Sequence, residues 1–79
     1  MAERITLTDM VAGQTGTVVE ILGGMGAHNR LRALGIRPGV KVSKVSPSFA
    51  RGPVVLRVGG TQTALGFGIC HKVIMELEQ

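Results

Sequence analysis

One thiol and two imidazoles are the side chains of this sequence that could bind a transition metal or act as nucleophiles. Cys70 and His71 are adjacent near the end of the chain, and His28 is the other histidine. Neighbouring side chains on a helical turn point about 100° apart, so Cys70 and His71 are poorly placed to hold one ion together. A structural zinc site uses spacings such as C-x₂₋₄-C, which a chain with one cysteine cannot supply. We therefore expect Cys70 to be a small buried residue, and any divalent metal at His28 or His71 to be weak or adventitious.

The remaining polar residues form no pattern typical of an enzyme or of a cofactor site. The five carboxylates show no paired spacing, and a cysteine beside a histidine is not a catalytic dyad unless the base faces the thiol. The glycines within residues 23–26 could in principle bind phosphate ahead of a helix. However, Asn29 stands where a dinucleotide-binding loop needs its third glycine, and no Lys-Ser or Lys-Thr pair follows. We predict neither an enzyme nor a bound cofactor.

The basic balance of the sequence bears on its partners. Nine Lys and Arg residues against five Asp and Glu residues give a formal net charge of +4. Such a domain can attract nucleic acid, an anionic membrane surface or an acidic protein patch. The basic residues form no run, and the aromatic platforms that single-strand binders use would have to come from Phe49 and Phe67 alone. We expect no nucleic-acid binding, although a basic RNA-binding small barrel remains one alternative.

Nothing in the sequence predicts a secreted or membrane-embedded chain. No apolar run approaches the roughly 20 residues of a membrane span, and the first residues lack the apolar stretch of a signal peptide. A single cysteine rules out an internal disulfide and suits a reducing compartment. We expect one soluble cytoplasmic domain, residues 1–79, and the sequence leaves its oligomeric state open.

Two surfaces are candidates for binding a protein partner. The first is the loop between Pro47 and Pro53, where Phe49 and Arg51 offer an aromatic anchor and a cation, residue types that are enriched among binding hot spots. The second is the solvated face of a predicted helix, together with arginines close to it. Its members are His28, Asn29, Arg32, Arg30 and Arg37.

A helical repeat within residues 23–39 would position the second surface. Ala27, Leu31 and Leu34 recur at i, i+4 and i+7, which predicts one apolar helix face. His28 and Arg32 then lie side by side on the opposite face, as an i, i+4 pair. A glycine-rich loop, residues 23–26, leads into this helix.

The end of this helix carries a complete stop signal. Gly35 stands where the C′ residue takes a left-handed backbone, and Ile36 follows as the apolar residue that can fold back onto Leu31. Pro38 and Gly39 occupy the second and third positions of a type II turn. The helix is therefore expected to turn directly into a strand.

Strand-like segments make up most of the remaining chain. Adjacent Val18 and Val19 break the alternation of the first strand-like segment, so a bulge or a strong twist is expected near Gly16. Thr8 is a candidate cap for a turn over residues 9–12, and residues 67–72 predict a single helical turn. The fold class is mostly β: a small SH3-like barrel of about five strands with one inserted short helix and a late helical turn. Its strands are predicted at residues 14–22, 40–46, 54–58, 61–65 and 73–77.

Short motifs follow one another in a fixed order along the chain. They are Leu7-Thr8-Asp9-Met10 with Gly13 and Gly16, Val18 through Gly23-Gly24, Arg30-Leu31, Leu34-Gly35-Ile36, Pro38-Gly39, Gly52-Pro53-Val54, Gly60, Leu65-Gly66 and Val73-Ile74-Met75. At these spacings the ordered set resembles the FeoA family. Two departures from the family pattern are Cys70, where a small Ala is usual, and the aromatic and basic loop at Phe49 and Arg51.

The resemblance implies a cytosolic accessory protein of ferrous-iron uptake. Such a protein contacts the FeoB permease and is recruited to the inner membrane by that partner. The same barrel occurs at the C-terminus of DtxR-type metal-dependent repressors. Here it begins at Met1 with no DNA-binding helices before it, so we expect a stand-alone protein. A metal-responsive SH3-like module that binds a divalent transition metal is the alternative from another functional class.

Overall fold

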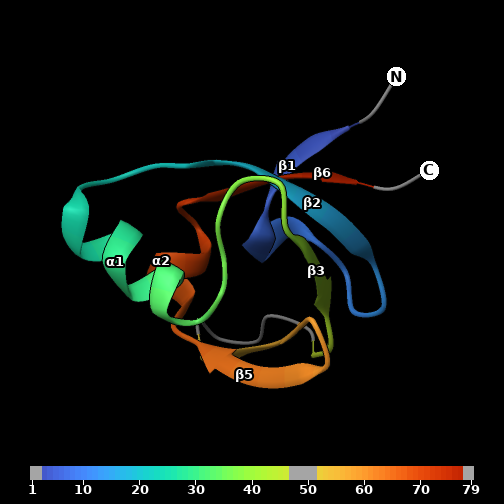
Figure 1. The fold of residues 1–79 in the computed structure, drawn as a ribbon. Helices are drawn as coiled ribbons and strands as arrows, with labels where there is room; N and C mark the ends of the chain where they lie inside the picture. The colour runs from blue at the N-terminus through green and yellow to red at the C-terminus, as the bar shows by residue number, and fades with distance from the viewer. Residues whose placement is uncertain (1–2, 47–51, 78–79) are drawn as a thin grey trace.

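One antiparallel sheet dominates the computed structural model, which describes residues 3–46 and 52–77. Within those residues six strands are hydrogen-bonded in the order β1-β6-β2-β3-β4-β5. Figure 1 shows the strongly curved sheet, with α1 and α2 at the end of the molecule away from both chain termini. The elements are β1 (Arg4–Thr6), η1 (Leu7–Asp9), β2 (Thr15–Ile21), α1 (Met25–Ala33), β3 (Lys41–Lys44), β4 (Val54–Val58), β5 (Thr61–Leu65), α2 (Phe67–Cys70) and β6 (Val73–Leu77).

The mostly β, SH3-like architecture confirms the predicted fold class, with one strand more than expected. The additional strand is β1, in which Ile5 pairs with Met75 of β6. Its strand character comes from a partner at the other end of the chain, so no local pattern indicates it. The tight hairpin between β4 and β5 lies where the two glycines, Gly59 and Gly60, predict it.

A bulge in β2 lies at Val19. The register of β2 against β6 shifts between Val18 and Glu20, which leaves Val19 as the extra residue. Residues three apart on a regular strand face opposite sides of the sheet. Val18 and Ile21 are nevertheless both buried, because the bulge turns the strand back toward the core. The bulge predicted near Gly16 therefore lies further along the strand.

The end of α1 follows the predicted stop signal. Gly35 has φ +83°, and its N–H donates to the Arg32 carbonyl at 2.9 Å. The Ile36 N–H donates to the Leu31 carbonyl at 2.9 Å, which completes a Schellman motif. Ile36 is fully buried, so the backbone closes the helix end and the next side chain anchors it in the core.

The predicted type II turn follows at once. The Val40 N–H donates to the Arg37 carbonyl at 3.1 Å, and Gly39 takes φ +95° after Pro38. The Gly39 N–H also donates to the Val18 carbonyl at 2.8 Å. The turn is thus tied to β2 while it leads the chain from α1 into β3.

The short helical turns differ in position from their predictions. η1 begins at Leu7 without a side-chain cap, and Thr8 lies inside it and is buried, so the predicted Thr8 cap is wrong. Leu7 and Met10 both enter the core, and a 3₁₀ turn places residues three apart on one side. α2 ends at Cys70, before the predicted limit of residue 72. None of the helices in the described residues is long and apolar enough to cross a membrane.

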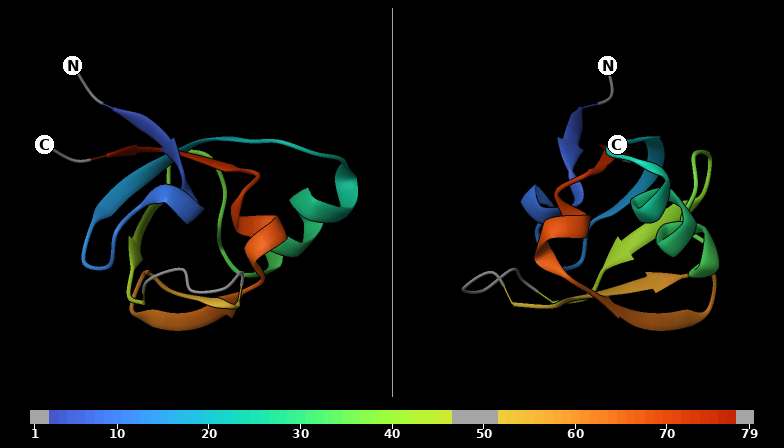
Figure 2. Two further views of the ribbon diagram at one scale, coloured as in Figure 1. Left: turned by 180° about the vertical axis from the view of Figure 1, so that it is seen from behind. Right: turned by 90° about the vertical axis from the view of Figure 1, so that its left-hand side faces the viewer.

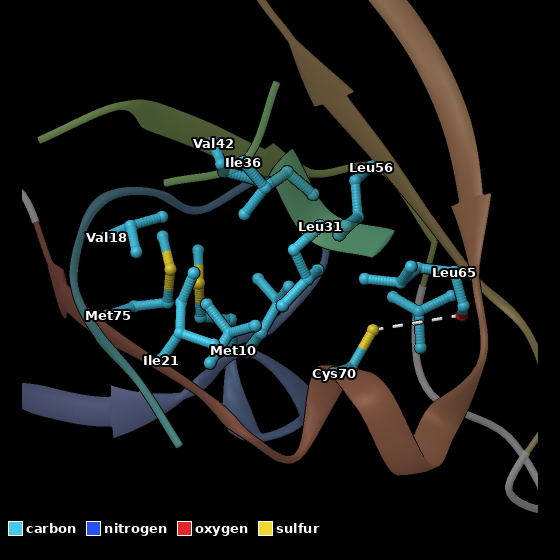
Figure 3. Packing of buried hydrophobic residues seen from close by; sticks show 13 residues of the cluster. Met10, Val18, Ile21, Leu31, Ile36, Val42, Leu56, Leu65, Cys70 and Met75 are labelled. Carbon is cyan, nitrogen blue, oxygen red and sulfur yellow. Dashed lines mark hydrogen bonds between the residues drawn. The ribbon is translucent and has the colours of Figure 1, made fainter. Parts of the chain in front are cut away.

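Aliphatic and sulfur-containing side chains fill the interior of the sheet (Figure 3). Leu31 and Ile36 connect α1 to this core, and Cys70 connects α2. No aromatic ring belongs to the fully buried cluster formed by the described residues. Its members are Leu7, Met10, Val18, Ile21, Leu31, Ile36, Val42, Val54, Leu56, Leu65, Cys70, Val73 and Met75.

Candidate functional site

Cys70 is fully buried, as predicted. Its Sγ points into the core from α2 and donates to the Leu65 carbonyl at 3.8 Å (Figure 3). Burial raises the pKa of the Cys70 thiol from 9.0 to about 11, against a smaller opposing effect of the Lys44 charge. Metal binding and nucleophilic attack require the thiolate. At neutral pH Cys70 is therefore a neutral core residue.

His71 belongs to the surface and not to a site shared with Cys70. Its ring is stacked on Phe67, with centroids 6.4 Å apart and planes at 11°. Its Nδ1 lies 3.3 Å from Thr8 Oγ1, a hydrogen bond that links the end of α2 to η1. His28 lies on α1. In the part of the chain that the structure describes, no three His, Cys, Asp or Glu residues are grouped as metal ligands would be.

Lys44 is a buried cation that sequence reasoning missed. Only 1% of its surface is exposed, and its Nζ donates to the carbonyls of Thr8 at 2.8 Å and Met10 at 2.6 Å. Burial lowers the pKa of Lys44, and neighbouring ionisable groups partly oppose this effect. The amine thus holds η1 against β3. The alternation of β3 carries the only sequence signal, because it places Lys44 on the same face as the apolar Val42.

The inner face of α1 is the predicted apolar stripe. Leu31 is fully buried, and Ala27 and Leu34 are half-buried. The short helix is therefore seated on the core mainly through one leucine and the capping Ile36. This support fixes the direction in which the outer side chains of α1 project.

The predicted partner-binding residues of α1 lie on two flanks of the helix. Arg32 is exposed, as predicted, whereas His28 is half-buried. Arg30 is also exposed, but positions 30 and 32 lie about 160° apart around a helix, so these two arginines point in nearly opposite directions. Arg37 is exposed in the turn after α1. The structure therefore does not gather the arginines into one cluster.

On the same flank as Arg32, but at the start of the helix, α1 exposes an apolar side chain that sequence reasoning did not single out. Met25 is 69% exposed at the start of the helix, and Leu22 just before it is 44% exposed. Met25 and Arg32 are seven residues apart, which places them within about 20° of each other around the helix. The other predicted surface, the loop with Phe49 and Arg51, lies outside the described residues.

The family model of the FeoA domain matches residues 5–77, almost the whole chain. The chain belongs to the FeoA domain family. A FeoA crystal structure described as that of an iron uptake regulatory protein is 32% identical in sequence, with a TM-score of 0.91. That match covers 96% of this chain and 100% of the other. No curated protein is significantly similar to the chain in sequence.

More distant structures share the FeoA fold. FeoA from Stenotrophomonas maltophilia, solved with zinc and described as a procaryotic SH3 domain protein, has a TM-score of 0.76 at 24% identity, covering 90% of this chain and 88% of that one. A manganese-dependent transcriptional repressor has a TM-score of 0.89 at 15% identity. That match covers 99% of this chain and 44% of the repressor. The family match confirms the resemblance seen in the motifs. As a FeoA domain, the chain is an accessory protein and not an enzyme.

Proposed function

We propose that this FeoA-domain protein supports ferrous-iron uptake by docking on the cytosolic part of a FeoB-type permease. The family match over residues 5–77 carries the proposal. It is supported by the 32% identity to a protein described as an iron uptake regulator. The Stenotrophomonas protein is described as a candidate activating factor of ferrous iron transport, a role that docking on a transporter would serve. The protein would work in the cytoplasm and reach the inner membrane through its partner.

Docking acts through contact in this proposal, without chemistry of the chain's own. The one thiol, Cys70, is buried and neutral. The outer flank of α1 instead exposes Met25 and Arg32, and Met and Arg are enriched at protein interfaces. Leu31 seats the helix on the core and the Gly35 motif closes its end. A partner therefore meets these side chains on a rigid support, which limits the entropy lost on binding.

A binding measurement with the purified cytosolic region of the permease tests the proposal. We expect saturable binding by the wild-type chain. An unrelated basic SH3-like domain of similar net charge is the control and should not bind. If the folded wild-type chain fails to bind at micromolar concentrations, the docking function is wrong.

The alternative of a metal-responsive module makes a different prediction. Its candidate ligands are the exposed His71 and the half-buried His28. After dialysis we expect elemental analysis to find no stoichiometric iron in the wild-type protein. Tight one-to-one ferrous iron that is lost in His71→Ala would instead support the metal-responsive function.

A further inference from the structure

The carboxylates of this chain are segregated from its cations. No Asp or Glu occurs between residues 21 and 75, whereas this stretch holds eight of the nine Lys and Arg residues. The cations form no run in the sequence, so the separation is visible only from the positions of the acidic residues. The acids are Glu3, Asp9, Glu20, Glu76 and Glu78, and the basic residues of the stretch are Arg30, Arg32, Arg37, Lys41, Lys44, Arg51, Arg57 and Lys72.

The fold gives this sequence pattern a spatial counterpart around α1, although Lys44 on β3 lies beside η1, which holds Asp9. The acids that the structure describes belong to, or directly precede, β1, η1, β2 and β6, and the three strands are neighbours in the sheet. Glu76 and Arg4 form an ion pair at 3.5 Å, on the strands that lead to the termini, while α1 lies at the opposite end (Figures 1 and 2). No described carboxylate lies within ion-pair distance of Arg30, Arg32 or Arg37.

Four residues at the α1 end form a surface that we call the α1 pole: Leu22, Met25, Arg32 and Lys72. The Leu22 N–H donates to the Lys72 carbonyl at 2.7 Å. The Lys72 side chain lies along Gly23, with its Cδ 3.1 Å from the place where a Cβ on that glycine would stand. Leu22 and Lys72 are therefore neighbours, while Met25 and Arg32 lie on one flank of α1, about two turns apart.

We propose that the α1 pole binds an acidic patch on the partner protein, with carboxylates opposite Arg32 and Lys72 and an apolar contact for Met25. The inference rests on the proposed function. It adds that the surface of the permease that binds this chain is acidic. A guanidinium pairs with a carboxylate through two parallel hydrogen bonds. Since Arg32 has no described carboxylate beside it, pairing with a partner breaks no such ion pair within the chain.

Two other anionic partners fit this surface less well. Each basic residue near an anionic bilayer strengthens attachment by only about fivefold, so the few cations of the α1 pole would hold a bilayer weakly. Single-stranded nucleic acid is held by aromatic side chains on which its bases stack. The α1 pole has none. An acidic protein surface with an apolar part would instead contact both the apolar and the cationic side chains of the α1 pole.

The test compares matched charge removals at the two ends of the molecule. Arg32→Gln removes a cation of the α1 pole, and Arg4→Gln makes the same change beside the termini. We expect Arg32→Gln to weaken binding to the permease's cytosolic region by about fivefold or more and to flatten its salt dependence. Adding Lys72→Gln should weaken it further. Arg4→Gln should stay within about twofold of wild type.

A second variant tests the apolar contact. Met25→Ser should weaken binding while leaving its salt dependence unchanged, because it removes no charge. Its melting temperature should match wild type, since the side chain is largely exposed. A Met25→Ser variant that binds as tightly as wild type would exclude the apolar contact.

The possible outcomes separate this inference from the proposed function. If wild type binds the permease and Arg32→Gln binds equally well, the α1 pole is not the contact, although docking stands. If wild type binds phosphatidylglycerol vesicles or an RNA oligonucleotide at physiological salt as tightly as the permease, the assignment to an acidic protein is wrong. If wild type does not bind the permease at all, the proposed function fails and the inference fails with it.

Discussion

The ammonium group of Lys44 lies inside the fold, between β3 and η1. Burying an ammonium group carries a desolvation penalty. Here two charge-assisted hydrogen bonds, to the carbonyls of Thr8 and Met10, offset it. η1 in turn supplies Leu7 to the core, and Met10, the residue that follows η1, is also buried there. Lys44 therefore works as an internal brace between β3 and η1.

Replacing Lys44 with methionine tests this brace. Lys44→Met keeps the approximate length of the side chain but leaves two buried carbonyls without their donor. We expect it to lower the free energy of unfolding by about 1–3 kcal/mol in a urea titration. Arg57→Met, at an exposed position of the neighbouring strand β4, is the control and should change it by less than about 0.5 kcal/mol. An unchanged midpoint for Lys44→Met would contradict the brace.

The buried thiol makes stability depend on pH in the alkaline range. The pKa of Cys70 is about 11 in the folded chain and 9.0 for an ordinary thiol. The unfolded state therefore loses this proton first as pH rises. The contribution of Cys70 is fully present below about pH 9 and is lost as pH rises through about 11. A difference of about two pH units corresponds to about 2–3 kcal/mol.

Comparison with Cys70→Ala removes most of the effect of Lys44, although the charges of Cys70 and Lys44 influence each other. The pKa of Lys44 is lowered by burial from 10.5, so the contribution of Lys44 rises with pH up to about that value, opposite in sign to Cys70. Both proteins contain Lys44. We expect the stability advantage of wild type over Cys70→Ala to shrink by about 2–3 kcal/mol between pH 8 and 11 in urea titrations. Parallel stability curves would show that the thiol titrates normally in the fold.

Among the elements, those specified by local sequence were predictable and those specified by distant pairing were not. Gly35, Pro38 and Gly39 lie within a few residues of the groups that they turn, so the end of α1 follows from the sequence alone. β1 and the bulge at Val19 depend on β6, which lies far along the chain. Their positions are therefore decided by tertiary pairing.

The same distinction applies to the candidate site. The 3.6-residue period places Arg32 outside and Leu31 inside, and both positions are confirmed. The burial of Lys44 and the exposure of Met25 oppose the usual preference of each residue type. Only the packing of neighbouring elements decides such cases. The stretch without acidic residues is present in the sequence, but only the fold places α1 at the end of the molecule away from Arg4 and Glu76.

Gly26 within α1 and Gly35 just after it should respond to alanine with opposite changes in stability. Gly35 has φ +83°, and an added Cβ would meet nothing closer than Val58 at 3.8 Å. Gly35→Ala therefore suffers from backbone strain and not from a clash. We expect it to lower the free energy of unfolding by about 1 kcal/mol or more. Gly26→Ala, within the helix and in open space, should raise it by about 0.5–1 kcal/mol. Equal stability of the two variants would show that the helix end has been misassigned.

For the molecule as a whole, net charge sets the response to salt. The chain carries a formal charge of +4, and the described residues form one ion pair, which is exposed. Such pairs contribute little, so the repulsion among cations outweighs them. We expect the melting temperature to rise with sodium chloride as this repulsion is screened. The melting temperature of the Arg32→Gln variant should rise less over the same range of salt. A melting temperature that falls with added salt would contradict a dominant repulsion.

The place of β6 between β1 and β2 has a consequence for the synthesis of the protein. The last strand along the chain is an interior strand of the sheet and pairs with both N-terminal strands. A nascent chain that lacks it has β1 without a partner and one side of β2 open. Native contacts of such long sequence separation form slowly. The sheet can therefore close only after Leu77 has left the ribosome, and the open edge of β2 remains exposed to other chains until then.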